Sequence, residues 1–220
     1  MQKLYYIEIN ENIDASVFNQ LLLLTSIEKR QKISQYRFDI DKKLCLYSDV
    51  LIRCLACLEL KSSNEQLEFY TNDYGKPYLM GYQNFQFNSS HTKNAIAAGI
   101  SKNPLGVDIE KIKSLDLNIA KRFFTENELH YILLDTNNQD QRFFEIWTQK
   151  EAYIKYIGKG LAIPLKSFDV THNILKDKIS ALKIDNYIIS AFSGLRFRNN
   201  DVVQISESEI SFMAMSLLKS

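Results

Sequence analysis

The strongest constraint on the fold of this 220-residue chain is an order of elements that occurs twice, a helical region followed by short alternating strands. The first helical region covers residues 26–60 and carries an apolar stripe at helical spacing. The strands predicted after it are residues 67–70, 77–79, 85–88 and 95–100. Helices are predicted again at 118–134 and 140–156, and strands at 167–171, 187–192, 202–205 and 211–217. This order predicts an α+β protein made of two halves packed face to face.

The best boundary between the two halves is the polar segment 101–104, which ends in a proline. We therefore assign residues 1–104 to an N-terminal half and residues 105–220 to a C-terminal half. A strand with two acids, at residues 106–111, follows this boundary at once, so its acidic face is expected at the interface of the halves. A cleft at that interface would be a natural active site.

Three acidic side chains of the second half could converge on one point. Asp108 and Glu110 are two residues apart on a predicted strand, so their side chains share one face. Glu151 and Lys155 are four residues apart on a predicted helix and project from the same side. Carboxylates suit a hard cation such as Mg²⁺, and an ammonium beside them suits a phosphate. Each pattern alone has a simpler interpretation, because alternating acids often form a solvated strand face and a Glu-Lys pair often stabilises a helix.

Five sequence blocks occur together in one order along the chain. They are Tyr-Gly-Lys-Pro at 74–77, Phe-Asn-Ser-Ser-His at 87–91, the acidic strand at 106–111, Phe-Phe-Thr-Glu-Asn-Glu at 123–128, and residues 147–161 continuing into 164–168. A single block is weak, since Gly-Lys-Pro is also an ordinary turn. Together, in order and approximate spacing, they resemble the 4'-phosphopantetheinyl transferases of the surfactin-synthetase-activating type. The resemblance implies two similar halves in a pseudo-twofold arrangement with the active site at their interface.

The resemblance also implies an activity. Members of this family transfer the 4'-phosphopantetheine arm of coenzyme A to a serine of an apo acyl or peptidyl carrier protein and release adenosine 3',5'-bisphosphate, with Mg²⁺ bridging the pyrophosphate. Asp108, Glu110 and Glu151 are then the expected metal ligands, and Lys155 is expected to stabilise the leaving phosphate. Glu151 is also the first candidate for the base that takes the serine proton, directly or through water. Glu128 is expected to be an alternative base or a structural partner in the cleft.

The first half is expected to bind coenzyme A. The resemblance implies six binding residues, with Lys29 and Lys32 at the 3'-phosphate, Lys76 and His91 at the phosphates, and Ser90 and Asn88 nearby. Without the resemblance, two lysines on a helix surface would be interpreted as solvated and a single histidine as structural. The segment 158–160, Gly-Lys-Gly, lacks the pattern of a Walker phosphate loop and is expected to contact the carrier protein.

Composition limits the partners. The chain has 27 basic and 26 acidic side chains and a net charge of +1, which gives no reason to expect a nucleic acid or an anionic membrane. No apolar run approaches the roughly 20 residues that cross a bilayer, and the first ten residues lack the apolar core of a signal peptide. We therefore expect a cytoplasmic protein. We also expect a monomer, because two halves in one chain can form the whole cleft.

The cysteine pattern gives no indication of a zinc site. The three cysteines are expected to be buried free thiols, since no second pair or nearby histidine completes a zinc site. A magnesium-dependent phosphohydrolase or nuclease would also use three carboxylates and a lysine. A catalytically inactive carrier-binding scaffold would keep the fold, although the presence of all three acids and of Lys155 argues against it.

Overall fold

The structure, a computed structural model, describes residues 2–12 and 14–218. Residues 1, 13, 219 and 220, which the two expected halves include, lie outside the described residues. The helices are α1 (Ala15–Leu23), α2 (Ile27–Ser34), α3 (Asp39–Leu60), α4 (Leu117–Phe123), α5 (Glu126–Leu133), α6 (Gln139–Ile157), α7 (Asn173–Lys176) and α8 (Glu207–Leu217). The strands are β1 (Gln2–Glu8), β2 (Phe69–Thr71), β3 (Pro77–Leu79), β4 (Gln86–Thr92), β5 (Ala95–Ser101), β6 (Leu105–Lys111), β7 (Ile179–Ile184), β8 (Tyr187–Ser193) and β9 (Val202–Gln204). Within the described residues, no helix is both long enough and apolar enough to cross a lipid bilayer.

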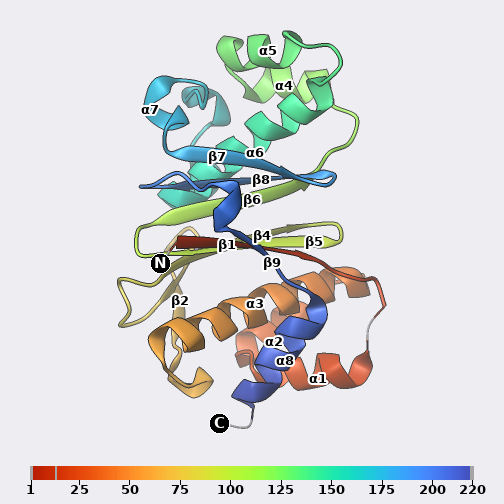
Figure 1. The fold of residues 1–220 in the computed structure, drawn as a ribbon, viewed down its shortest axis with the longest axis vertical. Helices are drawn as coiled ribbons and strands as arrows, with labels where there is room; N and C mark the ends of the chain where they lie inside the picture. The colour runs from red at the N-terminus through yellow and green to blue at the C-terminus, as the bar shows by residue number, and fades with distance from the viewer. Residues whose placement is uncertain (1, 13, 219–220) are drawn as a thin grey trace.

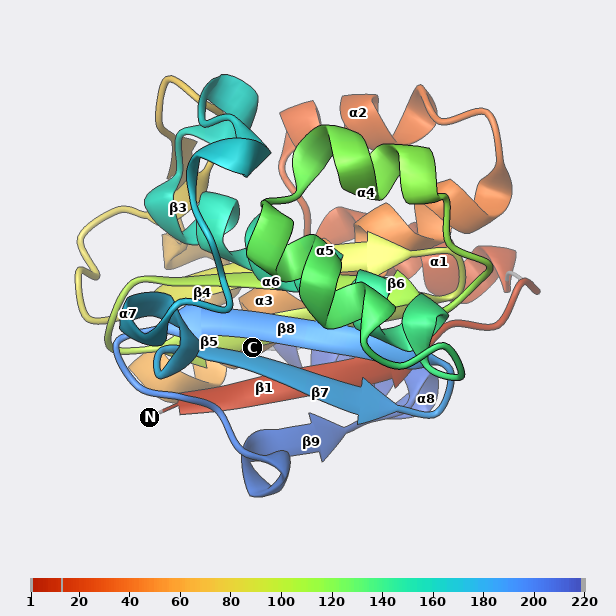
Figure 2. The same cartoon turned by 90° about the horizontal axis from the view of Figure 1, so that it is seen from above.

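The elements form four layers, with two sheets between two layers of helices (Figure 1). One sheet has the strand order β4-β5-β1-β9, and α3 lies across its outer face with α1, α2 and α8. The other sheet has the order β6-β8-β7, and α6 crosses the outer face of β6 and β8, with α4 and α5 beyond it (Figures 1 and 2). β2 and β3 form a separate hairpin. Each half is thus a sheet covered by one long helix, which confirms the expected α+β class and the two similar halves.

Small side chains allow the two sheets to pack closely. The apolar cluster between the sheets includes Ala95 and Ala97 of β5, both without solvent exposure. A Cβ atom added at Gly99 would lie only 2.6 Å from Leu105 Cδ1 and 2.9 Å from Val107 Cγ2. Because larger residues on β5 would push the sheets apart, this composition brings β6 directly against the first half.

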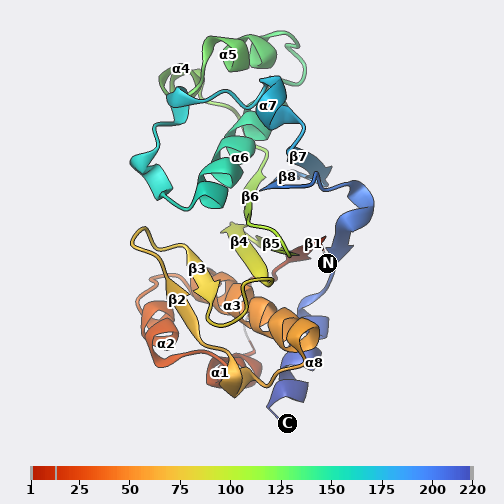
Figure 3. The ribbon, with the colours of Figure 1, turned by 90° about the vertical axis from the view of Figure 1, so that its left-hand side faces the viewer.

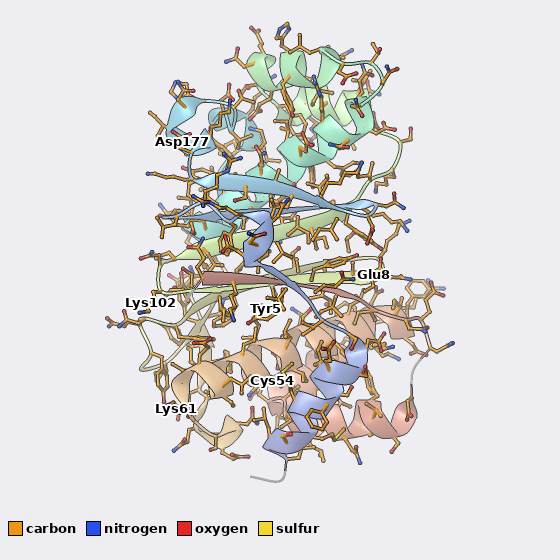
Figure 4. All side chains as sticks on the ribbon, in the orientation of Figure 1. Tyr5, Glu8, Cys54, Lys61, Lys102 and Asp177 are labelled. Atoms are coloured by element: carbon orange, nitrogen blue, oxygen red, sulfur yellow. The ribbon has the colours of Figure 1, made fainter. Side chains whose placement is uncertain are left out.

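A second apolar cluster lies between the first sheet and its helices, and a third lies under α6. Tyr5 of β1 and Cys54 of α3, both labelled in Figure 4, belong to the second cluster. Cys54 is buried, and Cys45 and Cys57 of the same helix are also buried free thiols, as the sequence predicts. Burial raises the pKa of Cys54 to about 12, so this thiol stays protonated at neutral pH.

The end of the chain returns to the first half. β9 pairs in parallel with β1, with Leu4 opposite Val202, and α8 packs against α3. Residues 202–217 therefore complete the first sheet and its helical layer, although the sequence-based division at residue 104 assigns them to the C-terminal half. The strands of the second sheet all follow residue 104.

Most predicted elements are confirmed, but two strand predictions in the second half are wrong. Residues 211–217 are part of α8, whose start carries a capping box in which Ser206 and Glu209 each accept a hydrogen bond from the other's backbone N–H. Residues 167–171 form the end of a 3₁₀ turn and a loop, because backbone groups there bond to the side chains of Glu128 and Lys150 and not to a strand. β7 is absent from the predicted strands.

Candidate active site

The site lies where β4 of the first sheet runs beside β6 of the second. Alternate side chains of β4 form hydrogen bonds with β6, so these bonds join the two halves. The bonds are Val107 N to Asn88 Oδ1 (2.8 Å), Ser90 Oγ to Asp108 Oδ1 (2.8 Å) and Thr92 Oγ1 to Glu110 Oε2 (2.9 Å). The period-two spacing of a strand puts the three β4 side chains on one face, opposite the two acids of β6.

A glycine allows α6 to lie directly against β6. A Cβ atom at Gly106 would lie 2.0 Å from Ala152 O and 2.3 Å from Tyr156 N, so every other residue would force the helix away from the strand. This contact turns the side of α6 that carries Glu151 and Lys155 towards Asp108. The sequence analysis expects the three acids and the lysine to converge, and Gly106 is what allows α6 to approach β6 closely.

Asp108 and Lys155 form the centre of the site. Lys155 Nζ lies 2.7 Å from Asp108 Oδ1 and 2.7 Å from Ser90 Oγ. Asp108 is buried, and its second oxygen, Oδ2, has no hydrogen-bond partner among the described residues. A buried carboxylate oxygen without a partner is rare and costly, so it indicates a position where an additional ligand is expected.

The neighbouring acids repel one another. Burial raises the pKa of Glu151 above its ordinary value, and the negative charge of Asp108 raises it further. Burial also raises the pKa of Glu110, although the hydrogen bond from Thr92 counteracts this effect. A bound cation would relieve the repulsion between these carboxylates. Within residues 2–12 and 14–218, however, no three His, Cys, Asp or Glu side chains are already grouped closely enough to hold a metal ion. The chemistry of the donors fits a hard cation, and Lys155 occupies one oxygen of Asp108 in the structure.

A cleft of about 290 Å³ opens beside these residues. It is lined by the hairpin turn at 74–77, by Asn88 and Ser89 of β4, and by Glu151 and Lys155 of α6. The cleft therefore has walls from both halves, at the interface where the sequence predicts the active site.

The lysines expected at the 3'-phosphate lie on α2, at the edge of the site. Lys29 Nζ is 3.1 Å from Asp49 Oδ1 and is partly exposed, while Lys32 is exposed. Desolvation lowers the pKa of His91, and the positive charges of Lys155, Lys32 and Lys29 lower it further. His91 is exposed, and the charge of Asp41 partly counteracts the effect of these lysines on its pKa.

Lys76 contributes to the wall of the cleft, but its ammonium is directed at protein carbonyls. Lys76 is 8% exposed, and its Nζ donates to Leu105 O at 3.1 Å and to Tyr156 O at 2.9 Å. Burial lowers its pKa to about 8. The sequence analysis expects Lys76 at the coenzyme phosphates, but in the structure its ammonium already donates to two backbone carbonyls.

Glu128 lies apart from the other predicted site residues and has a full set of structural partners. It has no solvent exposure, and its Oε1 lies 2.7 Å from Lys150 Nζ and accepts a hydrogen bond from Val170 N at 2.9 Å. Its Oε2 accepts from Thr125 N at 2.8 Å. These contacts support the second of the two expected roles, that of a structural partner.

Thr92, Asn72 and Gly106 are absent from the residues to which the sequence assigned a role. Thr92 could have been found, because it continues the alternation of Asn88 and Ser90 along β4. Asn72 donates from Nδ2 to Gly158 O at 2.8 Å, across 86 positions of sequence, and no local pattern gives that contact.

A cleft between the two halves that is lined by Glu151 and Lys155, with Asp108 paired to that lysine, suits the transfer of a phosphate-linked group. Comparison with known proteins agrees. Residues 104–197 match the family model described as the 4'-phosphopantetheinyl transferase superfamily, and residues 14–101 match that of the 4'-phosphopantetheinyl transferase N-terminal region. The first match ends where the chain turns back towards the first sheet.

Two bacterial relatives match over most of their length. The chain is 40% identical over 176 residues to the 4'-phosphopantetheinyl transferase gsp of Aneurinibacillus migulanus, covering 79% of this chain and 73% of the relative. It is 34% identical over 169 residues to the 4'-phosphopantetheinyl transferase Sfp of Bacillus subtilis strain 168, covering 76% of this chain and 75% of the relative. The chain belongs to the 4'-phosphopantetheinyl transferase family.

Proposed function

We propose that this enzyme transfers the 4'-phosphopantetheine arm of coenzyme A to a serine of an apo acyl or peptidyl carrier protein and releases adenosine 3',5'-bisphosphate. Family membership supports the reaction. The observation that carries the proposal is the carboxylate of Asp108, which binds Lys155 through one oxygen, while its other oxygen is buried and has no hydrogen-bond partner in the described part of the chain. A phosphohydrolase or an inactive scaffold is not favoured, because the relatives are named as transferases.

Asp108, Glu110 and Glu151 would hold a magnesium ion. Bound there, Mg²⁺ would neutralise charge on the diphosphate of coenzyme A and make the phosphorus easier to attack. Burial and repulsion by the neighbouring acids raise the pKa values of Glu110 and Glu151, and Asp108 Oδ2 has no hydrogen-bond partner among the described residues, which supports this assignment. Thr92 would orient Glu110 through its 2.9 Å hydrogen bond.

Lys155 would stabilise the leaving phosphate. Its ammonium lies 2.7 Å from Asp108 Oδ1, is partly exposed, and lines the cleft, so a diphosphate oxygen can reach it. Charge develops on that oxygen as the phosphorus–oxygen bond breaks, and a fixed ammonium stabilises the transition state more than the bound substrate.

Glu151 would take the proton of the attacking serine, directly or through a water molecule. A general base must lie within hydrogen-bond reach of the proton it takes, directly or through one water, and Glu151 lines the cleft next to Lys155. Glu151 lines the cleft, whereas Glu128 is fully buried and hydrogen-bonded elsewhere. We therefore propose Glu151, and not Glu128, as the base.

Basic and polar side chains of the first half would bind coenzyme A. Lys29 and Lys32 would contact the 3'-phosphate and His91 the phosphates, with Ser90 and Asn88 nearby. The segment 158–160 at the end of α6 would contact the carrier protein. We also propose that the enzyme acts in the cytoplasm as a monomer without nucleic-acid or membrane partners, which agrees with its balanced charge.

The test is an assay of product release. The full chain is incubated with coenzyme A and Mg²⁺, with and without apo carrier proteins of fatty-acid, polyketide and nonribosomal peptide synthesis. We expect adenosine bisphosphate only when a carrier is present, together with a matching mass increase on that carrier. Release without a carrier would indicate a hydrolase, and carrier binding without release would indicate a scaffold.

A further inference from the structure

The turn of the β2–β3 hairpin contacts the end of α6. Asn72 Nδ2 donates to Gly158 O at 2.8 Å, and Lys76 Nζ donates to Tyr156 O at 2.9 Å. We call these four residues the hairpin–helix contact. Figure 3 shows the hairpin turn next to the segment that follows α6, although 80 positions of sequence separate Lys76 from Tyr156. The contact joins an element of the first half to the helix that carries Glu151 and Lys155.

The physics of helix ends explains the contact. The last carbonyl groups of a helix have no partner within the helix, and the negative end of the helix dipole favours a positive charge there. Tyr156 O is such a carbonyl, and the Lys76 ammonium gives it a donor. The same ammonium donates to Leu105 O, at the start of β6. One side chain thus bonds to the end of α6 and to the start of the strand that carries Asp108.

The contact is closely packed as well as hydrogen-bonded. Gly158 has φ of +73°, and a Cβ atom there would lie 2.8 Å from Lys76 Cδ. The aliphatic part of Lys76 is therefore in direct contact with the turn that ends α6. Moving its ammonium towards a phosphate would leave the buried Leu105 O and the partly buried Tyr156 O without this donor, which carries an energetic cost.

We propose that Lys76 is a positioning residue for the transfer reaction. By bonding to Tyr156 O and Leu105 O it holds the last turn of α6 against β6 and so fixes Lys155 relative to Asp108. This inference rests on the proposed function, and it assigns Lys76 to the alignment of the reacting groups and not to the binding of coenzyme phosphate.

A matched control exists elsewhere in the chain. Lys43 is also buried, and its Nζ donates to Asn10 O and Asn12 O, both at 2.7 Å, and pairs with Glu207. It has no part in the cleft. Lys43→Met therefore removes a buried, carbonyl-bound ammonium without touching the hairpin–helix contact.

The experiment compares Lys76→Met, Lys43→Met and the unchanged full chain. We expect Lys76→Met to lower kcat by about tenfold to a hundredfold, because small displacements of catalytic groups cost that much, while KM for coenzyme A stays within about twofold. Amide hydrogen exchange at residues 105–107 and 155–158 should become faster in Lys76→Met. Lys43→Met should lower Tm but leave kcat and exchange at these residues unchanged.

Asn72→Asp is the second variant and serves if Lys76→Met does not fold. It keeps the oxygen that accepts from Tyr74 N and Lys76 N but removes the donor to Gly158 O. We expect a smaller change in kcat and in exchange, in the same direction.

A Lys76→Met enzyme with normal kcat, a KM raised by about tenfold or more and unchanged exchange would overturn the proposal and make Lys76 a phosphate contact. If the unchanged chain modifies no carrier, the proposed function fails. The exchange measurement uses no substrate, so it still decides whether Lys76 holds the end of α6.

Discussion

Two lysines of α6, five positions apart, each lie 2.7 Å from a carboxylate. The two pairs differ in their solvent exposure and in their hydrogen-bond partners. The side chains of Lys150 and Glu128 are both 0% exposed, and Lys150 Nζ also donates to Leu165 O and Phe168 O. The side chain of Lys155 is 27% exposed at the cleft, and within residues 2–12 and 14–218 one oxygen of Asp108 has no hydrogen-bond partner. The first pair is complete within the protein, whereas the second has a position left for a ligand.

The difference between the two pairs distinguishes charged groups that stabilise the fold from charged groups that form a binding site. A buried pair with every polar atom bonded contributes mainly to the fold, and removing one partner is costly because the other charge stays buried alone. A pair with an unpartnered oxygen and with neighbouring acids of raised pKa is typical of a binding site. Both lysine–acid pairs fall within blocks of the family resemblance, so sequence resemblance alone does not distinguish them.

The largest effect is expected at the second pair. Asp108→Ala and Glu151→Ala should each abolish transfer, with turnover reduced by about a thousandfold or more, because each removes a proposed magnesium ligand. Glu110→Ala should behave in the same way. Steady-state assays over a range of magnesium concentrations measure this, with circular dichroism as the control for folding. Near-normal turnover of the Asp108 and Glu151 variants at limiting magnesium would contradict the metal assignment.

The first pair should give the opposite result. Glu128→Gln should lower the free energy of unfolding by about 3–5 kcal/mol, because Lys150 is left as a buried charge without its partner. Turnover per folded molecule should stay close to that of the unchanged chain. Urea denaturation and assays below the unfolding midpoint measure the two quantities. A stable Glu128→Gln protein without activity would restore Glu128 as a candidate base.

Lys155→Ala tests the role of the lysine in the second pair. Turnover should fall by about a hundredfold with little change in KM for coenzyme A, since the ammonium acts on charge that develops during the reaction. Lys155→Arg should restore only part of the rate, because a planar guanidinium differs in shape from an ammonium. An unchanged kcat with weaker coenzyme binding would make Lys155 a simple binding residue.

Exposed charges should matter less than either pair. The double variant Lys29→Ala, Lys32→Ala should reduce the preference for coenzyme A over dephospho-coenzyme A by about tenfold, because only the former carries the 3'-phosphate. The loss should be smaller at 1 M salt, where the Debye length is about 3 Å. Dephospho-coenzyme A is the internal control. Equal discrimination by the unchanged chain and the double variant would place the 3'-phosphate elsewhere.

The smallest effect concerns the pH dependence of stability without metal. The pKa values of Glu110 and Glu151 are raised in the folded protein from 4.5, so just above pH 4.5 the folded state binds more protons than the unfolded state. Stability therefore falls as the pH rises from 4.5 through the raised pKa values. Glu110→Gln should remove the contribution of Glu110 to this loss and raise Tm at neutral pH. Tm measured from pH 4 to 7 in a chelator tests this, and an identical pH profile of the variant would contradict it.

The sequence predicted the parts of the site that depend on local periodicity. β6 and α6 follow from alternation and helical spacing, and these periods put Asp108 and Glu110 on one face and Glu151 beside Lys155. The roles of Lys76 and Glu128 do not follow, because their partners are groups up to 80 positions away. The strand predicted at residues 211–217 is wrong, because these residues belong to α8. The capping box formed by Ser206 and Glu209 at the start of that helix is visible in the sequence.

The return of the chain to the first sheet has a consequence for biosynthesis. Along this chain β1 is made before its parallel partner β9, and the second sheet is made between them. Until then one edge of β1 and the side of α3 that α8 covers have no partner, and such surfaces favour association with other chains. The first half is thus finished only after the second has been synthesised. Contacts of this sequence separation slow folding, so both halves are expected to reach their final packing together, after synthesis.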